Sequence, residues 1–168
     1  MKHILSLLCL IIWTSLFPSN WLKVYNIDGT EKQLDDHTTR LIICYSSPSC
    51  HQCMEALVHY CGLIASQNQH CQCAVLIKGD DIFSMRMETT FLEEYIPDTT
   101  VMPICYDSNP CKRKRFFKKK KMRYSPALLV IDKDNHYHFF SYESLFDDEQ
   151  GLVKCFDKIE RIIGNETN

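Results

Sequence analysis

The stretch that decides the fold is Leu41-Ile42-Ile43-Cys44-Tyr45-Ser46-Ser47-Pro48-Ser49-Cys50-His51-Gln52-Cys53. It begins with a short apolar run rich in isoleucine, which is typical of a buried strand. Serines and a proline fill the turn before the cysteine pair. Beyond the pair, apolar residues recur at three- and four-residue steps and predict an amphipathic helix over 53–67. These residues are Met54, Leu57, Val58, Cys61, Ile64 and Ala65.

The position of the cysteine pair indicates its chemistry. The first turn of a helix has unpaired N–H groups and carries a partial positive charge. A Cys-x-x-Cys thiol at such a position can have a pKa between ~3.5 and ~7.5, against ~8.5 for a free cysteine. We therefore expect Cys50 to be the exposed nucleophile and Cys53, one helical turn further along, to be its resolving partner.

Outward from this stretch, strand-like and helix-like segments alternate. Such alternation favours an α/β fold, a mostly parallel sheet flanked by helices, and a closing hairpin adds antiparallel strands. The predicted elements are a β-hairpin over 21–34, strands over 41–45 and 73–77, a helix over 83–96, strands over 101–106, 127–131 and 136–142, and a last helix over about 148–163.

Length and composition fit one domain behind a targeting segment. The chain has 168 residues, of which 45% are hydrophobic and 24% charged. In residues 1–20, a short basic start is followed by an uncharged apolar run over 4–17 and a break at Pro18. That run has the length of a signal-peptide core and is short for a spanning helix, although Phe17 makes a poor cleavage site. We expect a signal peptide or signal anchor over 1–20 and a single domain over 21–168.

The chain holds ten cysteines, which can pack, pair or bind metal. Cys44, Cys61 and Cys155 lie on predicted apolar faces and are expected to be small core residues. Cys105 and Cys111 flank a turn sequence and can close a small loop.

Structural zinc is an alternative for the cysteine pair. Cys71 and Cys73, with His70 adjacent, follow Cys53 at a spacing found in zinc ribbons. An intervening helix would separate the two pairs by ~20 Å at ~1.5 Å per residue. Zinc ligands must lie within ~2.3 Å of the metal, so the spacing disfavours this alternative.

Three segments together resemble the thioredoxin-like superfamily, closest to its TlpA-like or redoxin thiol–disulfide oxidoreductases. The resemblance covers about residues 22–163. Its segments are the hairpin around Tyr25-Asn26-Ile27-Asp28-Gly29-Thr30, the motif Ser49-Cys50-His51-Gln52-Cys53, and Tyr124-Ser125-Pro126-Ala127-Leu128-Leu129-Val130-Ile131-Asp132. The chain departs from the family at Ser49, where a tryptophan is usual, and Glu55 lies one position from the family's glutamate.

The resemblance implies a thioredoxin-like fold, a redox role for Cys50 and Cys53, and no prosthetic group. It implies that Pro126 is a cis-proline facing the cysteine pair. The backbone of Ser125 would then be exposed to pair with an extended substrate. His51, between the two cysteines, is expected to tune the redox potential, because a nearby imidazolium lowers a thiol pKa.

A basic stretch over 112–123 is the other unusual feature. It holds nine of the 19 Lys and Arg residues, which leaves ten basic against 21 acidic residues elsewhere. The stretch is either a solvated helix face or a surface for an acidic partner or an anionic membrane. We expect no nucleic-acid partner for an exported chain.

These observations predict a thiol–disulfide oxidoreductase of the bacterial cell envelope, periplasmic or anchored to the outer face of the cytoplasmic membrane. Its partners would be cysteine-containing envelope proteins and an upstream thiol reductant or oxidant. Two alternatives stay open. One is a peroxiredoxin-like peroxide reductase, although Ser47 replaces the threonine typical of that family. The other is a non-catalytic binding module that recruits a partner through its basic stretch.

Overall fold

The computed structural model describes residues 24–26, 28–35, 37–46, 49–77, 82–96, 98–107 and 125–164, with the backbone alone at 82–85 and 107. The predicted targeting segment over 1–20, the basic stretch over 112–123, Ser47 and Cys111 lie outside these ranges. Within them, no helix has the length and apolarity needed to cross a membrane.

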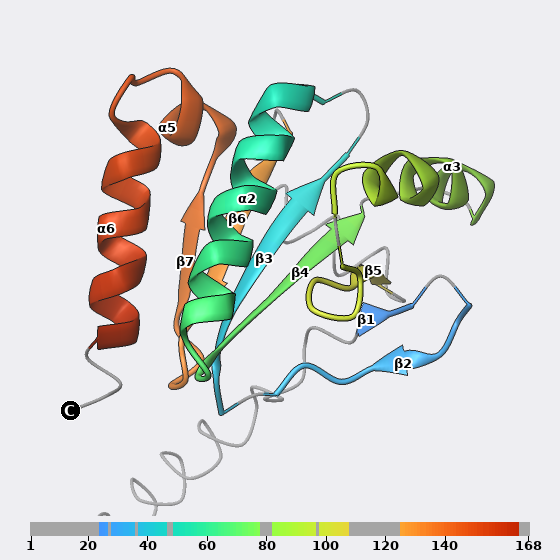
Figure 1. The fold of residues 1–168 in the computed structure, drawn as a ribbon, viewed down its shortest axis with the longest axis horizontal. Coiled ribbons are helices and arrows are strands. Elements are labelled where there is room, and N and C mark those ends of the chain that lie inside the picture. The colour runs from blue at the N-terminus through green and yellow to red at the C-terminus, as the bar shows by residue number, and fades with distance from the viewer. Residues whose placement is uncertain are drawn as a thin grey trace, which may run out of the picture.

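A seven-stranded mixed sheet forms the centre of the molecule, in the order β2-β1-β5-β4-β3-β6-β7 (Figure 1). Its strands are β1 (Val24–Tyr25), β2 (Glu31–Lys32), β3 (Thr39–Tyr45), β4 (Cys71–Ile77), β5 (Ile104–Asp107), β6 (Ala127–Ile131) and β7 (Tyr137–Phe140). The helices are α2 (His51–Gln67), α3 (Ile82–Glu93), α5 (Tyr142–Phe146) and α6 (Gly151–Gly164). The predicted α/β sheet with flanking helices and an N-terminal hairpin is confirmed. Among the described strands only β3–β4 and β4–β5 pair parallel, so the sheet is mixed and less parallel than the alternation of elements predicted.

Strand register brings the two central sequence motifs to one end of the sheet. β3 and β4 run parallel, from Thr39 opposite Cys71 to Tyr45 opposite Ile77. β6 runs antiparallel to β3, and Cys44 lies opposite Ala127. The start of β6 therefore lies beside the end of β3. Because the cysteine pair follows β3 and the Ser125–Pro126 segment precedes β6, both are placed at this same end.

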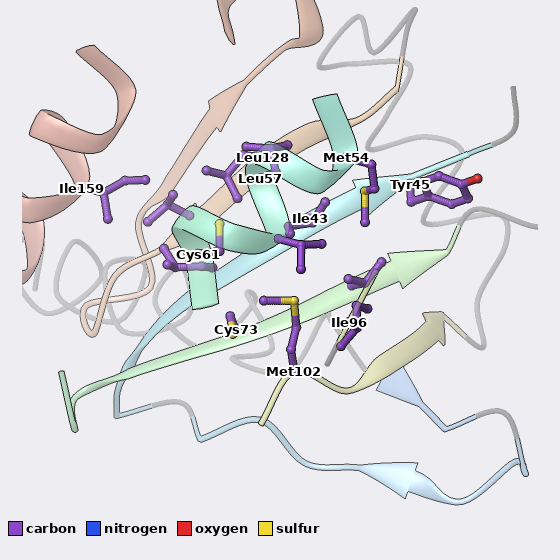
Figure 2. Packing of buried hydrophobic residues seen from close by; sticks show 14 of the residues in the cluster. Ile43, Tyr45, Met54, Leu57, Cys61, Cys73, Ile96, Met102, Leu128 and Ile159 are labelled. Carbon is purple, nitrogen blue, oxygen red and sulfur yellow. The ribbon is translucent and has the colours of Figure 1, made fainter. Parts of the chain in front are cut away.

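Alternation along the strands divides the buried side chains between two clusters. On β3, Leu41, Ile43 and Tyr45 belong to one cluster, and Ile42 and Cys44 belong to the other. The first cluster is the larger and includes buried residues of α2, α3 and α6. Figure 2 shows Leu57 of α2 and Ile159 of α6 among them. The second cluster holds strand residues and partly buried Leu34, and none of its members comes from a described helix. This two-sided burial explains why the central strands read as continuous apolar runs.

The N-terminal hairpin turns where its sequence predicts. Gly29 has a φ of +87°, a conformation that glycine adopts without a Cβ penalty. The Asp28 carboxylate accepts hydrogen bonds from the N–H (2.8 Å) and hydroxyl (2.6 Å) of Thr30. β1 also pairs antiparallel with β5, so the hairpin extends the sheet beyond the parallel strands.

Most elements differ from the sequence-based expectation by a few residues at one end, and two of these differences lie at the candidate site. α2 begins at His51, two residues before the predicted start, because Cys50 acts as its N-cap. The strand predicted over 136–142 ends at Phe140, and the short helix α5 follows. Ser141 caps that helix by accepting the N–H of Ser144 at 3.4 Å. A local capping bond thus ends the extended conformation that the apolar pattern alone suggested.

Candidate active site

Cys50 and Cys53 form a disulfide at the start of α2, with their Cα atoms 5.2 Å apart. Cys50 is the N-cap, and its carbonyl accepts the N–H of Met54 at 3.0 Å. Its sulfur accepts the backbone N–H of Cys53 at 3.3 Å. Both cysteines are half-buried, so Cys50 is less exposed than the sequence suggested. A reduced Cys50 would have the same N–H directed at its sulfur.

The electrostatics of the helix start favour a negative sulfur. α2 has 17 residues, so its unpaired N–H groups and dipole carry their full partial positive charge at Cys50. No acidic side chain lies in the first turn to oppose this charge. These features lower the pKa of a cysteine thiol placed at the N-cap.

The Ser125–Pro126 segment lies against the turn that presents the cysteines. Its peptide bond is cis. The Ser125 hydroxyl accepts the backbone N–H of Ser46 at 2.8 Å and donates to the hydroxyl of Ser49 at 3.3 Å. Ser125 is 5% exposed, whereas Ser46 and Ser49 are half-buried, so both bonds are partly buried. This second bond joins Ser49, the residue before Cys50, to the segment before β6.

Tyr142 is a site residue that sequence reasoning missed. Its hydroxyl oxygen lies 3.6 Å from the sulfur of Cys53 and can donate to that sulfur in the disulfide. Tyr142 is the first residue of α5, and its ring packs on Phe146 with centroids 5.1 Å apart. The local signal was the Ser141 cap, which predicts a helix start where the apolar pattern predicted strand.

His51 lies beside a cluster of three aromatic side chains, Tyr45, Phe91 and Tyr95. Its exposed ring lies 4.5 Å from the Phe91 ring and 6.1 Å from the Tyr95 ring, centroid to centroid. Burial raises the pKa of Tyr45, and a hydrogen bond to the Glu88 side chain raises it further. The imidazole is therefore held beside the helix start by packing.

The six other described cysteines are buried free thiols. Cys44 and Cys61 are fully buried and Cys155 nearly so, which confirms their prediction as core residues. Burial raises the pKa of Cys44 to about 12, of Cys155 to about 12 and of Cys73 to about 11. Cys105 is also buried, but the loop predicted with Cys111 stays a prediction, since Cys111 lies outside the described residues.

The zinc alternative for the two cysteine pairs is wrong. Cys71 lies opposite Thr39 at the start of β3, whereas Cys50 follows Tyr45 at the other end of that strand. Six strand residues at ~3.3 Å each separate the two ends by ~20 Å. The side chains of Cys71 and Cys73 instead pack in the larger core cluster.

A cavity of ≈ 500 Å³ lies along α2, and neither cysteine of the pair lines it. Its lining includes Val58, Leu63, Ile96, Val101 and Met102. The disulfide itself lies at a half-exposed helix start. A redox centre outside the cavity is accessible to a disulfide on a protein surface.

Comparisons with known proteins give structural matches alone. No family model matches the chain, and no curated protein matches it. A thioredoxin-like protein from Porphyromonas gingivalis aligns with a TM-score of 0.56 and 12% identity over 88% of this chain and 92% of that one. A thiol:disulfide interchange protein from a Bacteroides species aligns with a TM-score of 0.54 and 10% identity over 85% and 86% of the two chains.

The chain has a thioredoxin-like fold. An exposed lipoprotein thioredoxin from Streptococcus pneumoniae is also similar, with a TM-score of 0.51 and 15% identity over 81% of this chain and 97% of that one. Within the thioredoxin-like fold, the geometry brings four of the predicted site residues to one end of the sheet: Cys50, Cys53, Ser125 and Pro126.

Proposed function

We propose that this protein is a thiol–disulfide oxidoreductase that acts on protein cysteines through the Cys50–Cys53 pair. The observation that carries the proposal is a disulfide at the N-terminus of α2, with the residue before it, Ser49, hydrogen-bonded to Ser125 of the segment before β6. Thiol–disulfide exchange needs an accessible thiolate, a second thiol within reach and a surface for the partner disulfide.

The reaction follows from the arrangement of the two sulfurs. In the reduced protein, the Cys50 thiolate attacks one sulfur of a substrate disulfide, and the other substrate sulfur leaves as a thiolate. The Cys53 thiolate then attacks the Cys50 sulfur of the mixed disulfide and releases the first substrate sulfur. Two electrons pass to the substrate, its two thiolates take up protons, and the protein ends with the Cys50–Cys53 disulfide. The same steps in reverse oxidise a dithiol.

The surrounding residues support these steps in different ways. The helix start stabilises the Cys50 thiolate, and the N–H of Cys53 remains directed at it. Tyr142 contacts the resolving sulfur. His51 tunes the charge near the helix start, and Ser125 with Pro126 offers extended backbone to a substrate strand.

We place the protein in the bacterial cell envelope, exported or anchored through residues 1–20. The similarity in fold to an exposed lipoprotein thioredoxin supports this location. Cysteine-containing envelope proteins would be its substrates, and another thiol protein would supply or accept the electrons. The basic stretch over 112–123 would hold it near an acidic partner or an anionic lipid surface.

Trapping tests the proposal directly. With Cys53→Ser, the mixed disulfide on Cys50 cannot be resolved, so disulfide-linked adducts with envelope proteins should accumulate. The double variant Cys50→Ser/Cys53→Ser is the matched control and should form none. Failure of Cys53→Ser to form any adduct would contradict the mechanism.

A measured reduction potential distinguishes exchange from an inert structural disulfide, and a peroxide assay distinguishes it from peroxide reduction. A potential between about −120 and −270 mV fits exchange, whereas one below about −300 mV fits an inert structural disulfide in a binding module. A peroxide reductase would instead consume hydrogen peroxide with the Cys50 thiolate, and we expect no such turnover.

A further inference from the structure

Four metal-ligating side chains gather at the turn between β6 and β7. They are Asp132, Asp134, His136 and His138, and they come from the sequence Asp132-Lys133-Asp134-Asn135-His136-Tyr137-His138. β6 starts beside the cysteine pair and ends at Ile131, opposite Arg40 near the start of β3. The group therefore lies at the end of the sheet away from the disulfide, and the exchange mechanism makes no use of it.

Ligand atoms of three of these residues are close enough to share one ion, and His138 contacts one of the three. One atom each from Asp132, Asp134 and His136 lies within 4.8 Å of the others. The Oδ2 atom of Asp132 is 3.1 Å from Nδ1 of His136 and 3.4 Å from Nε2 of His138. Zinc bonds of ~2.1 Å at tetrahedral angles put neighbouring ligand atoms roughly 3.4 Å apart. The Oδ2 atom of Asp132 is thus already at the spacing of neighbouring zinc ligands from each of the two imidazoles.

The backbone of the turn holds this arrangement without using the atoms that would bind metal. The other oxygen of Asp132, Oδ1, accepts the N–H of His136 at 2.8 Å. The N–H of Asp132 donates to the carbonyl of His136 at 3.1 Å. Asn135 has a φ of +63°, and its side-chain oxygen accepts from the Arg40 guanidinium at 2.6 Å. Oδ2 of Asp132 and both imidazoles therefore face one another in a fixed loop.

The charges around the turn also suit a cation. The carboxylate of Asp132 faces the imidazoles of His136 and His138. With Asp134, the turn presents two carboxylates to two imidazoles. The positive charge of Arg40 partly offsets them, although its hydrogen bond is directed at Asn135. A set of two nitrogen and two oxygen ligands suits Zn²⁺, and imidazole binds Ni²⁺ and Cu²⁺ as well.

We propose that Asp132, Asp134, His136 and His138 form a binding site for a divalent transition-metal ion, with Zn²⁺ as the first candidate. The ion replaces the imidazole–carboxylate hydrogen bonds with four metal bonds. It joins the end of β6 to the start of β7 and so stabilises this hairpin. The site is independent of the proposed redox function, since no ligand is shared with it.

The test is calorimetric titration of the full-length, disulfide-oxidised protein with ZnCl₂ alone. We expect one Zn²⁺ per chain and a rise in the unfolding temperature with added Zn²⁺. Asp134→Asn removes an exposed ligand and leaves the hydrogen bonds of the turn intact. His136→Gln/His138→Gln removes both nitrogen ligands. Each variant should weaken binding by at least the ~10–100-fold that loss of an outer-shell partner costs, and should lose the thermal shift.

His70→Gln is the matched control, because His70 is exposed beside the start of β4 at the same end of the sheet. It should bind Zn²⁺ as the unmodified protein does. Co²⁺ serves as a spectroscopic probe and should show tetrahedral bands without a thiolate charge-transfer band, which excludes the free cysteines as ligands. The proposal is overturned by absence of Zn²⁺ binding, by unchanged affinity in Asp134→Asn and the double histidine variant, or by a thiolate band.

Discussion

The Cys50–Cys53 pair and the buried cysteines of the core place the same chemical group in opposite environments. Cys50 and Cys53 are half-buried at a helix start whose dipole and N–H groups favour a negative sulfur. Cys61, Cys73 and Cys155 lie in the larger core cluster, where burial raises each thiol pKa. The position of a cysteine relative to a helix end and to water therefore determines whether it reacts or packs.

The largest expected effect is loss of exchange activity in Cys50→Ser. Without the attacking sulfur, reduction of insulin disulfides by the protein should fall to the background rate. Cys61→Ser should instead keep its exchange activity and lose ~1–3 kcal/mol of stability, because its hydroxyl enters an apolar core. If the two variants lost similar activity per folded molecule, the proposed difference between the redox pair and the core cysteines would be wrong.

The rate of alkylation of Cys50 should exceed that of the buried core cysteines by orders of magnitude. In the reduced, folded protein we expect iodoacetamide to modify Cys50 with a pKa below the ~8.5 of a free thiol. Cys73 and Cys155 should resist modification at pH 8, because their pKa values are raised to about 11 and about 12. Mass spectrometry of digests taken across a pH series measures each site. A Cys50 that titrates no lower than a free cysteine would contradict the proposed nucleophile.

The buried thiols should also make the fold sensitive to alkaline pH. Burial raises their folded pKa values above the ~8.5 of a free thiol, with Cys44 at about 12. Between these two values the unfolded chain loses thiol protons that the folded chain keeps, so stability falls as pH rises from about 9 to 12. Urea unfolding across this range measures the trend. Cys44→Ala should reduce the slope, and an unchanged slope would mean that this thiol does not contribute.

A smaller effect is expected where the cis-proline segment meets the cysteine turn. Ser125→Ala removes the acceptor of the Ser46 N–H and the donor to Ser49, at a cost of ~1–3 kcal/mol for the unsatisfied amide. Exchange should slow as the turn loosens. Ser66→Ala is the control, since Ser66 bonds the Leu63 carbonyl on the exposed part of α2. Equal stabilities of the two variants would show that the contact is dispensable.

The smallest predicted change concerns Tyr142→Phe, which keeps the ring and removes the hydroxyl at Cys53. A neutral hydrogen bond is worth about 0.5–1.5 kcal/mol, so resolution of the mixed disulfide should change by roughly two- to tenfold. Stopped-flow decay of a Cys50 mixed disulfide measures it. Tyr60→Phe is the control and should leave the rate unchanged, because Tyr60 is an exposed tyrosine of α2 whose ring packs on Phe156.

Most of the central architecture was predictable from the chain itself. The apolar runs at 41–45 and 127–131 appear as β3 and β6, and the periodicity after Cys53 appears as α2. These patterns are strong because both sheet faces or one helix face must be buried. The prediction failed at 141–142, where a single capping serine outweighed a weak apolar alternation and started α5.

The strand β3, the turn after it and the position of the cysteine pair at a helix start follow from the sequence alone, because they depend on neighbours a few residues apart. Only the tertiary structure decided that Ser125 bonds Ser49, 76 positions earlier, and that Tyr142 contacts Cys53 across 89 positions. Those contacts depend on how β6 aligns with β3 and where β7 ends, and no local pattern contains that information.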